Sequence, residues 1–199
     1  MKQNKKFVAV TGGIGSGKST VLKMIGEEGF PVFSADAVAR GIYEDREVFE
    51  KTCKAFPDCV CAGKIDRKKL AEEVFSDQKK LDRLDAITHP AVMRILRRRM
   101  EEADGNVVFA EVPLLFEGNY QNGFDKVIVV LRDETDRFRD AAKRDGVTPE
   151  EIARRAKHQF NYEKNRIIGH TLLYNNGDLT ELRKRVHQIL EETIVEKKG

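Results

Sequence analysis

The residues with the most specific chemistry lie at positions 12 to 19, where the sequence reads Gly-Gly-Ile-Gly-Ser-Gly-Lys-Ser. This spacing matches the pattern Gly-x-x-x-x-Gly-Lys-Ser/Thr, in which the backbone N–H groups of a glycine-rich turn surround phosphate oxygens. Lys18 would reach the β- and γ-phosphates of a nucleoside triphosphate, and the Ser19 hydroxyl would bind Mg²⁺. The residues that we expect to contact the nucleotide are Gly13, Ile14, Gly15, Ser16, Gly17, Lys18, Ser19 and Thr20.

The segments on either side of this turn have the pattern that a phosphate loop requires. Residues 7–11 form a short apolar run of strand length before it, and Val21, Leu22 and Ile25 follow it at helical spacing. The predicted helix begins near Lys18, so its first N–H groups and its dipole would also face the phosphates. The alternative is a glycine turn without a ligand, and the agreement between motif and context favours phosphate binding.

A carboxylate follows the second apolar strand, which we expect over residues 31–34. Because parallel strands end at the same edge of a sheet, Asp36 would face the phosphate loop. There it would accept a hydrogen bond from a substrate hydroxyl and orient it toward the γ-phosphate, which makes it a candidate catalytic residue. The alternative is that Asp36 only caps a helix over residues 37–43.

Several arginines lie in a helical stretch between residues 134 and 166, and we considered Arg137, Arg144, Arg154 and Arg155. A guanidinium group binds phosphate in a bidentate manner, and one such group over the γ-phosphate stabilises the charge of the transition state. For most of these arginines a solvated helix face is a sufficient explanation. We favour Arg144 as a catalytic residue because it adjoins Asp145-Gly146, a turn at which a lid would close.

Three further positions have both a functional and a structural interpretation. Glu111 ends an apolar strand, roughly where an acidic residue helps to hold Mg²⁺ in phosphate-loop proteins. Residues 175–177, Asn-Asn-Gly, follow the last strand, where side-chain amides would contact an adenine edge or simply form a polar turn. Pro90 should end one helix and begin the next, with His89 in the turn between them.

The predicted elements alternate between strand and helix, which is typical of a doubly wound parallel α/β sheet. We expect strands that are rich in valine and isoleucine and buried on both faces over residues 7–11, 31–34, 106–112, 125–132 and 171–174. Residues 37–104 have helical patterns and no convincing strand, which indicates an inserted helical subdomain. Residues 148–151 form a capping box with proline at the first helical position, and a last helix runs from near Asp178 toward Glu196.

The composition fits one α/β domain with an insertion, since 40% of the 199 residues are hydrophobic and 35% are charged. The 36 basic and 33 acidic residues give a formal charge of +3, which does not indicate nucleic-acid binding, and the run Arg97-Arg98-Arg99 is more simply an exposed helix face. No apolar run is long enough to span a membrane, so we expect a cytoplasmic protein. The cysteines lack a nearby fourth ligand for zinc and are expected to be reduced thiols at Cys53, Cys59 and Cys61.

The combination of motifs resembles that of the dephospho-CoA kinases from end to end of the chain. The phosphate loop is shared by many small kinases, whereas the residues around Asp36, His89-Pro90 and residues 113–117 are more specific. The matching segments are residues 11–20, 35–40, 65–67, 89–90, 113–117, 144–145, 159 and 175–177. The family often has aspartate where this chain has Ser34, so a metal or hydrogen-bond role of that aspartate is not expected to carry over to this chain.

The resemblance implies a phosphate-loop NTPase-type fold and the phosphorylation of the ribose 3′-hydroxyl of dephospho-CoA by ATP with Mg²⁺, the last step of coenzyme A synthesis. It implies a nucleotide-binding core of residues 1–36 and 105–199, a helical lid at about 134–166, and an inserted acceptor-binding subdomain of residues 37–104.

The resemblance also implies roles for individual residues. Asp36 aligns with the aspartate that orients or deprotonates the hydroxyl, Arg144 aligns with the lid arginine that contacts phosphates, and Asn176 lies in the segment that borders adenine. The residues implied to border the acceptor are Asp36, Arg40, His89, Leu114, Leu115, Phe116 and Glu117.

Other functions stay open at this point. Another phosphate-loop kinase, of the shikimate or nucleoside type, would share the loop and an acidic residue after the second strand. A GTP-driven switch protein is disfavoured because no Asn-Lys-x-Asp guanine motif occurs, and a nucleic-acid-binding module is disfavoured by the near-neutral charge. We expect a monomer or a weak homo-oligomer whose partners are ATP and dephospho-CoA.

Overall fold

The computed structural model describes residues 5–157, 159–162 and 169–195. The chain divides into two compact units, one made of the segments up to Ser34 and from Met100 onward, the other of Ala35–Arg99. The sequence predicted boundaries after residues 36 and 104. Asp36 therefore belongs to the second unit and not to the unit that contains the phosphate loop.

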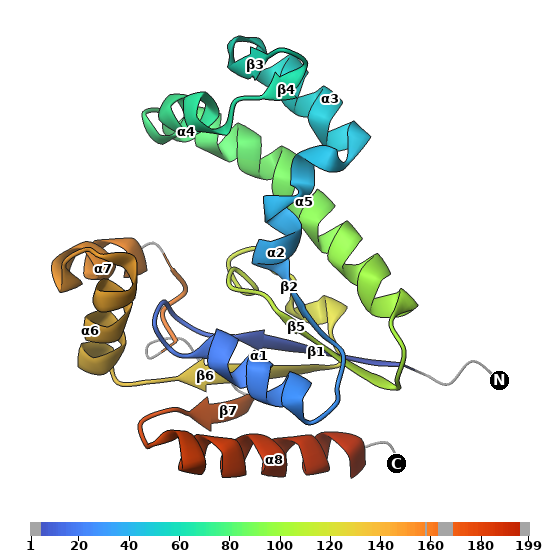
Figure 1. The fold of residues 1–199 in the computed structure, drawn as a ribbon, viewed down its shortest axis with the longest axis vertical. Helices are drawn as coiled ribbons and strands as arrows, with labels where there is room; N and C mark the ends of the chain where they lie inside the picture. The colour runs from blue at the N-terminus through green and yellow to red at the C-terminus, as the bar shows by residue number, and fades with distance from the viewer. Residues whose placement is uncertain (1–4, 158, 163–168, 196–199) are drawn as a thin grey trace. The chain divides into compact units, whose positions relative to one another are not determined.

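The first unit is built on a five-stranded sheet with the strand order β2-β5-β1-β6-β7, shown in Figure 1. The strands are β1 (Lys6–Thr11), β2 (Val32–Ser34), β5 (Val107–Glu111), β6 (Lys126–Leu131) and β7 (Thr171–Tyr174). All are parallel, and Val10 of β1 is in register with Glu111 on one side and Ile128 on the other. The five strands and the parallel sheet predicted from the sequence are confirmed.

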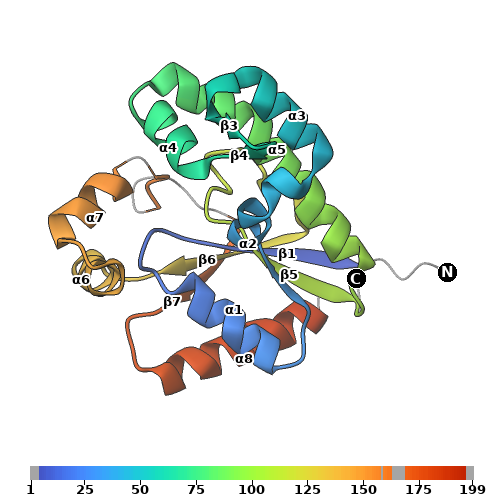
Figure 2. The same cartoon turned by 45° about the horizontal axis from the view of Figure 1, so that its top comes forward.

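Helices α1 (Lys18–Glu27) and α8 (Leu179–Val195) pack against each other and against the sheet, and they lie side by side in Figure 2. Their shared core includes residues that are at most 3% exposed, among them Val8, Val10, Ile25, Leu182 and Val186. Burial of each such side chain stabilises the fold by about 1.5–3 kcal/mol. This packing fixes the position of α1 and of the turn that precedes it.

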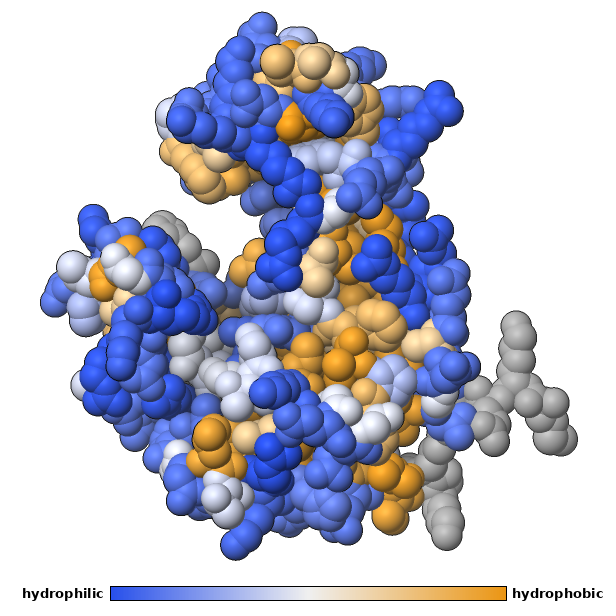
Figure 3. All heavy atoms as spheres, in the orientation of Figure 1, coloured by the Kyte–Doolittle hydropathy of each residue, from blue (hydrophilic) through white to orange (hydrophobic). Residues whose placement is uncertain are grey.

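Helices α6 (Glu134–Asp145) and α7 (Pro149–Ala156) form a hairpin in the first unit. Helix α6 ends at Gly146, whose φ of 68° lies in the left-handed region that favours glycine. The Thr148 hydroxyl accepts the backbone N–H of Glu151 at 3.3 Å and caps α7, so the predicted N-cap and the proline at the first helical position are confirmed. The outer surface of this hairpin is mostly hydrophilic in Figure 3.

The α6–α7 hairpin has a small apolar core of its own, made of Ala141, Ala142 and Ile152. Phe138 and Val147 pack against this core, and so does Ile14 from the turn between β1 and α1. The hairpin is thus joined to that turn by apolar contact as well as by chain connectivity.

The second unit is mainly helical. It contains α2 (Ala35–Arg40), α3 (Arg46–Ala55), α4 (Arg67–Phe75) and most of α5 (Gln78–Glu102). Short 3₁₀ helices occur at Ile42–Glu44 and Pro57–Cys59 in this unit, and at Gln121–Gly123 in the first unit. Among the described residues, no helix has both the length and the apolarity that crossing a membrane requires.

A small antiparallel hairpin, β3 (Val60–Cys61) and β4 (Lys64–Ile65), corrects the expectation that residues 37–104 contain no strand. Each strand has only two residues, which is too short to produce an alternating pattern in the sequence. The turn between them uses positive φ angles at Ala62 (47°) and Gly63 (72°).

Helix α5 runs unbroken through Pro90, so the prediction that one helix ends at His89 was wrong. Proline removes one backbone hydrogen bond and costs a helix about 3 kcal/mol. The apolar positions that follow it more than offset this cost, since Leu96 and Met100 are fully buried and Val92 nearly so. The periodic apolar face decided the local structure, and the proline did not.

The core of the second unit is formed by Phe56, Cys59, Leu70 and Val74. The buried Cys59 thiol donates a hydrogen bond to Glu73 at 2.9 Å, and burial, followed by this carboxylate, raises the pKa of Cys59 to about 11. All three cysteines are free thiols, with Cys53 partly buried and Cys61 exposed.

Candidate active site

The phosphate loop is the turn between the end of β1 at Thr11 and the start of α1 at Lys18. Its last residue, Gly17, precedes α1 with φ 96°, a left-handed conformation that strains any residue with a Cβ. A Cβ at this position would also lie 2.3 Å from Nδ2 of Asn175. The motif glycine is therefore needed both for the turn and for the close approach of the β7–α8 connection.

The polar side chains of the loop are arranged around its backbone. Lys18 Nζ donates hydrogen bonds to the carbonyl oxygens of Gly12 (2.9 Å) and Gly13 (3.1 Å). The Ser16 hydroxyl is buried and has no hydrogen-bond partner among the described residues. A buried hydroxyl without a partner costs free energy, and a phosphate oxygen in the loop would satisfy it.

Ser19, in the first turn of α1, donates a hydrogen bond of 3.4 Å to Oε1 of Glu111. Glu111 ends β5 and is only 7% exposed, so the sheet holds a buried carboxylate at the edge where the loop lies. A hydroxyl and a carboxylate are the oxygen ligands that Mg²⁺ uses together with phosphates and water. No cluster of three or more histidine, cysteine or acidic side chains suited to a metal occurs in the described part of the chain.

The two asparagines after β7 have different partners. Asn175 Nδ2 donates to the carbonyl oxygen of Ser16 at 2.9 Å and so supports the phosphate loop. Asn176, the residue predicted to border adenine, exchanges two hydrogen bonds of 3.0 and 2.9 Å with Asp133, just before α6. The sequence singled out Asn176, and the residue that supports the loop is its neighbour.

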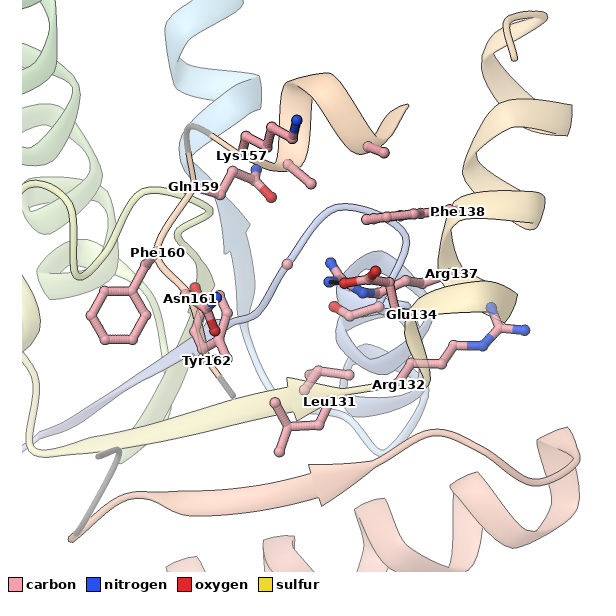
Figure 4. A pocket seen from close by; sticks show the side chains of 15 residues that line it. Leu131, Arg132, Glu134, Arg137, Phe138, Lys157, Gln159, Phe160, Asn161 and Tyr162 are labelled. Atoms are coloured by element: carbon pink, nitrogen blue, oxygen red, sulfur yellow. Dashed lines mark hydrogen bonds and ion pairs between the residues drawn. The ribbon is translucent and has the colours of Figure 1, made fainter. Parts of the chain in front are cut away.

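A pocket of about 390 Å³ lies between the phosphate loop and the α6–α7 hairpin, as Figure 4 shows. The loop contributes Gly13 and Ser16, and the hairpin contributes Glu134, Arg137 and Phe138 among others. The guanidinium of Arg137 covers the loop so closely that a Cβ on Gly13 would lie 2.6 Å from its Nη1. The sequence offered no reason to separate Arg137 from the exposed arginines, because this contact depends on how α6 packs.

Residues 159–162, which we call the strap, bind the loop and its neighbours along their length. Gln159 Oε1 accepts the backbone N–H of Ile14 at 2.9 Å, and the Tyr162 hydroxyl lies 3.1 Å from the Thr11 hydroxyl. The Phe160 N–H donates to the Glu117 carboxylate at 2.7 Å. Burial raises the pKa of Tyr162 to about 12, so its phenol is neutral at physiological pH.

The segment predicted to border the acceptor follows β5 and packs against the strap. The Phe116 ring stacks on the Phe160 ring with centroids 4.7 Å apart. Leu114 is 39% exposed, whereas Leu115 is fully buried and presents no surface to a ligand. Leu115 is therefore corrected from a contact residue to a packing residue, because the turn that follows β5 buries its side chain completely.

Arg144, the predicted lid arginine, is 62% exposed and forms hydrogen bonds of 2.7 and 3.2 Å with Asp145. The adjacent Asp145 carboxylate raises the pKa of Arg144 above its usual value, with a further contribution from the charge of Glu111. Arg155 shares Asp145 with it at 3.5 Å. The guanidinium is held on the hairpin and is open to solvent.

The remaining predicted residues belong to the second unit. Asp36 lies inside the first turn of α2 (Ala35–Arg40) and not before a helix over 37–43, which corrects the predicted capping role. Arg40 is in the last turn of the same helix, and its carbonyl oxygen accepts Arg67 Nη2 at 2.6 Å. His89 lies in the middle of α5, with Nε2 3.4 Å from an oxygen of Asp85.

A sequence profile of the dephospho-CoA kinase family matches residues 6–181. A dephospho-CoA kinase from Thermus thermophilus is 35% identical over 193 residues, which are 97% of this chain and 94% of that protein.

Solved structures agree with these sequence matches. A crystal structure of a Thermus thermophilus protein has a TM-score of 0.81 at 33% identity and covers 98% of this chain and 100% of its own. A dephospho-CoA kinase from Campylobacter jejuni has a TM-score of 0.70 at 26% identity, and the match covers 95% of this chain and 97% of that chain. A shikimate kinase from Acinetobacter baumannii, at a TM-score of 0.59 and 13% identity, shares the fold alone. The chain therefore belongs to the dephospho-CoA kinase family.

Proposed function

We propose that this protein transfers the γ-phosphoryl group of ATP to the ribose 3′-hydroxyl of dephospho-CoA and releases coenzyme A and ADP. The observation that carries the proposal is a phosphate loop whose Ser19 hydroxyl meets the buried Glu111 carboxylate, on a chain of the dephospho-CoA kinase family. Membership of a kinase family implies ATP as the co-substrate.

The first unit binds the nucleotide in this proposal. The loop amides and the N-terminus of α1 contact the β- and γ-phosphates, and Lys18 exchanges the carbonyl oxygens of Gly12 and Gly13 for phosphate oxygens. Ser19 and Glu111 hold Mg²⁺, which when bound neutralises negative charge on the phosphate oxygens. Asn176 borders the adenine.

The second unit, Ala35–Arg99, presents the acceptor. Asp36 accepts a hydrogen bond from the 3′-hydroxyl and aims its oxygen at the γ-phosphorus. As the new P–O bond forms and the bond to the β-phosphate oxygen breaks, the hydroxyl proton passes to Asp36 and ADP leaves. The side chains that line the acceptor are Arg40, His89, Leu114, Phe116 and Glu117.

Arg144 completes the site from the α6–α7 hairpin by exchanging Asp145 for a phosphate oxygen. The transition state of phosphoryl transfer is loose, so charge neutralisation and positioning contribute more than proton removal. Arg144 and Lys18 are therefore expected to affect turnover at least as strongly as Asp36 does.

The test is a coupled ADP-release assay with ATP and Mg²⁺ and a panel of acceptors: dephospho-CoA, shikimate, gluconate and adenosine. We expect saturable turnover with dephospho-CoA that exceeds that with any other acceptor by at least about a thousandfold, and its loss in Lys18→Ala. Comparable turnover with shikimate or a nucleoside would contradict the proposal. The cytoplasmic location and the monomeric or weakly oligomeric state stay predictions made from the sequence.

A further inference from the structure

The pocket under the α6–α7 hairpin contains one arginine that faces the phosphate loop. Arg137 is 15% exposed, whereas Arg139 and Arg144 on the same helix are 63% and 62% exposed. Its Nη1 lies 2.6 Å from the position of a Cβ on Gly13, and Figure 4 shows its side chain pointing into the pocket. Of these three arginines, only Arg137 lines the pocket.

Both the backbone and the side chain of Arg137 are fixed. A Cβ on Gly15 would lie 2.2 Å from the Arg137 carbonyl oxygen. The absence of a side chain at Gly15 therefore lets the backbone of α6 lie directly against the loop. The guanidinium carbon lies 4.6 Å from the centre of the Phe138 ring, which orients the planar group by a cation–π contact. A cation that is already ordered loses little conformational freedom when it binds an anion.

The partner of Arg137 is weakly held. That partner is Glu134, whose Oε2 lies 3.2 Å from Nη2 of Arg137 and whose side chain is 60% exposed. An ion pair with such an exposed carboxylate contributes little to stability, because water solvates the separated charges well. A phosphate oxygen in the loop would therefore displace Glu134 at small cost.

We propose that Arg137 binds the polyphosphate of the nucleotide held by the loop, and that Glu134 is the counter-ion which it releases on binding. A guanidinium beside the loop backbone adds a charge-assisted hydrogen bond to those of Lys18 and the loop amides. The inference depends on the proposed function only in that the loop binds a nucleotide, and it does not depend on the identity of the acceptor.

The experiment measures binding without any acceptor, by calorimetry, with inorganic tripolyphosphate, Mg·ADP and adenosine as probes. Arg137→Met should weaken the binding of tripolyphosphate and of Mg·ADP by about tenfold or more and leave the affinity for adenosine unchanged. Arg137→Lys keeps the charge and should therefore lose less of the affinity for tripolyphosphate and Mg·ADP. Arg139→Met is the matched control, since Arg139 pairs with Asp136 and Asp140 away from the pocket, and its affinities should stay within about twofold of wild type.

Glu134→Gln separates a ligand-binding role from a structural one. If Glu134 competes with phosphate for Arg137, its removal should tighten tripolyphosphate binding by a few-fold, whereas loss of a merely structural ion pair would not. Wild-type tripolyphosphate affinity in a folded Arg137→Met protein would overturn the proposal, and so would an equal loss in Arg139→Met. A loss confined to adenosine would overturn it in favour of a base contact. If Arg137→Met does not fold, the tripolyphosphate affinities of Arg137→Lys and Glu134→Gln decide, and wild-type affinity in both variants would overturn the proposal.

An Arg137-dependent affinity for tripolyphosphate in a protein that does not phosphorylate dephospho-CoA would leave this inference standing and reject only the proposed reaction. Turnover of dephospho-CoA with polyphosphate binding that is independent of Arg137 would do the reverse.

Discussion

The backbone N–H of Ile14, inside the phosphate loop, donates a 2.9 Å hydrogen bond to Oε1 of Gln159, which lies just beyond α7. The side chain of Ile14 packs at the same time into the apolar core of the α6–α7 hairpin. One loop residue is thus held by the hairpin through its side chain and by the strap through its backbone. The shape of the loop and the position of the hairpin are coupled through Ile14.

Gln159→Met, which removes the acceptor while keeping the length of the side chain, should raise the KM for ATP by roughly three- to tenfold. The reason is the loss of one backbone hydrogen bond, worth about 0.5–1.5 kcal/mol. The KM for dephospho-CoA should not change. Gln188→Met on α8, where Gln188 contacts only Glu192 among the hydrogen bonds of the described residues, is the control. An unchanged ATP KM in Gln159→Met would show that this bond does not shape the loop.

The Ser19–Glu111 pair should determine the magnesium requirement. Glu111→Gln keeps the shape of the side chain and removes its charge, so half-maximal activity should require about tenfold more Mg²⁺. Ser19→Ala should act in the same direction. Because we propose that both residues hold the same ion, the double variant should be less impaired than the sum of the two effects predicts. Full additivity in this double-mutant cycle, measured by magnesium titration of the initial rate, would argue for separate roles.

Asp36→Asn should lower kcat by about 10²–10⁴ with little loss of ATP affinity, because in the proposed reaction the carboxylate acts on the acceptor hydroxyl and not on the nucleotide. Steady-state rates with each substrate varied in turn, together with ATP binding by calorimetry, separate these two effects. Asp45→Asn tests whether any loss of a carboxylate in this unit has the same consequence, since Asp45 caps α3 by accepting the Val48 N–H. A kcat equal to wild type in Asp36→Asn would remove Asp36 from the chemistry.

The cysteines of the second unit should differ in reactivity at pH 8. Burial raises the pKa of Cys59 to about 11, so only roughly one molecule in a thousand carries the Cys59 thiolate at that pH. The fraction rises about tenfold with each pH unit until the pH approaches 11. The exposed Cys61 should react first with a thiol reagent, and mass spectrometry of labelled peptides gives the order. Labelling of Cys59 ahead of Cys61 in the folded protein would contradict this burial.

Much of the first unit could be predicted from local sequence. Buried parallel strands are rich in β-branched residues, and the phosphate loop and the capping box at Thr148 have fixed spacings. The loop and the helix cap meet their conformational needs within a few residues, and each buried strand is marked by its own apolar composition although its hydrogen bonds go to distant strands. For that reason their positions could be predicted without knowledge of the tertiary fold.

The predictions from sequence failed, or were missing, where contacts between residues far apart in the chain determine the structure. Pro90 stays inside α5 because buried side chains beyond it stabilise the helix. Leu115 is fully buried, and no local pattern in its segment predicted that burial. The hydrogen bond between Ile14 and Gln159 joins residues 145 positions apart, and the approach of Arg137 to Gly13 likewise depends on how α6 packs. No pattern in the sequence of α6 distinguished Arg137 from the other arginines of the helix.

The measurement that tests the central claim most directly identifies the product formed from dephospho-CoA and ATP by this protein. We predict that mass spectrometry will show the gain of one phosphate per ADP released, and that phosphorus NMR will assign it to the ribose 3′-oxygen. Lys18→Ala should form neither product. Release of ADP without a phosphorylated acceptor, or phosphate attached elsewhere on the molecule, would contradict the account.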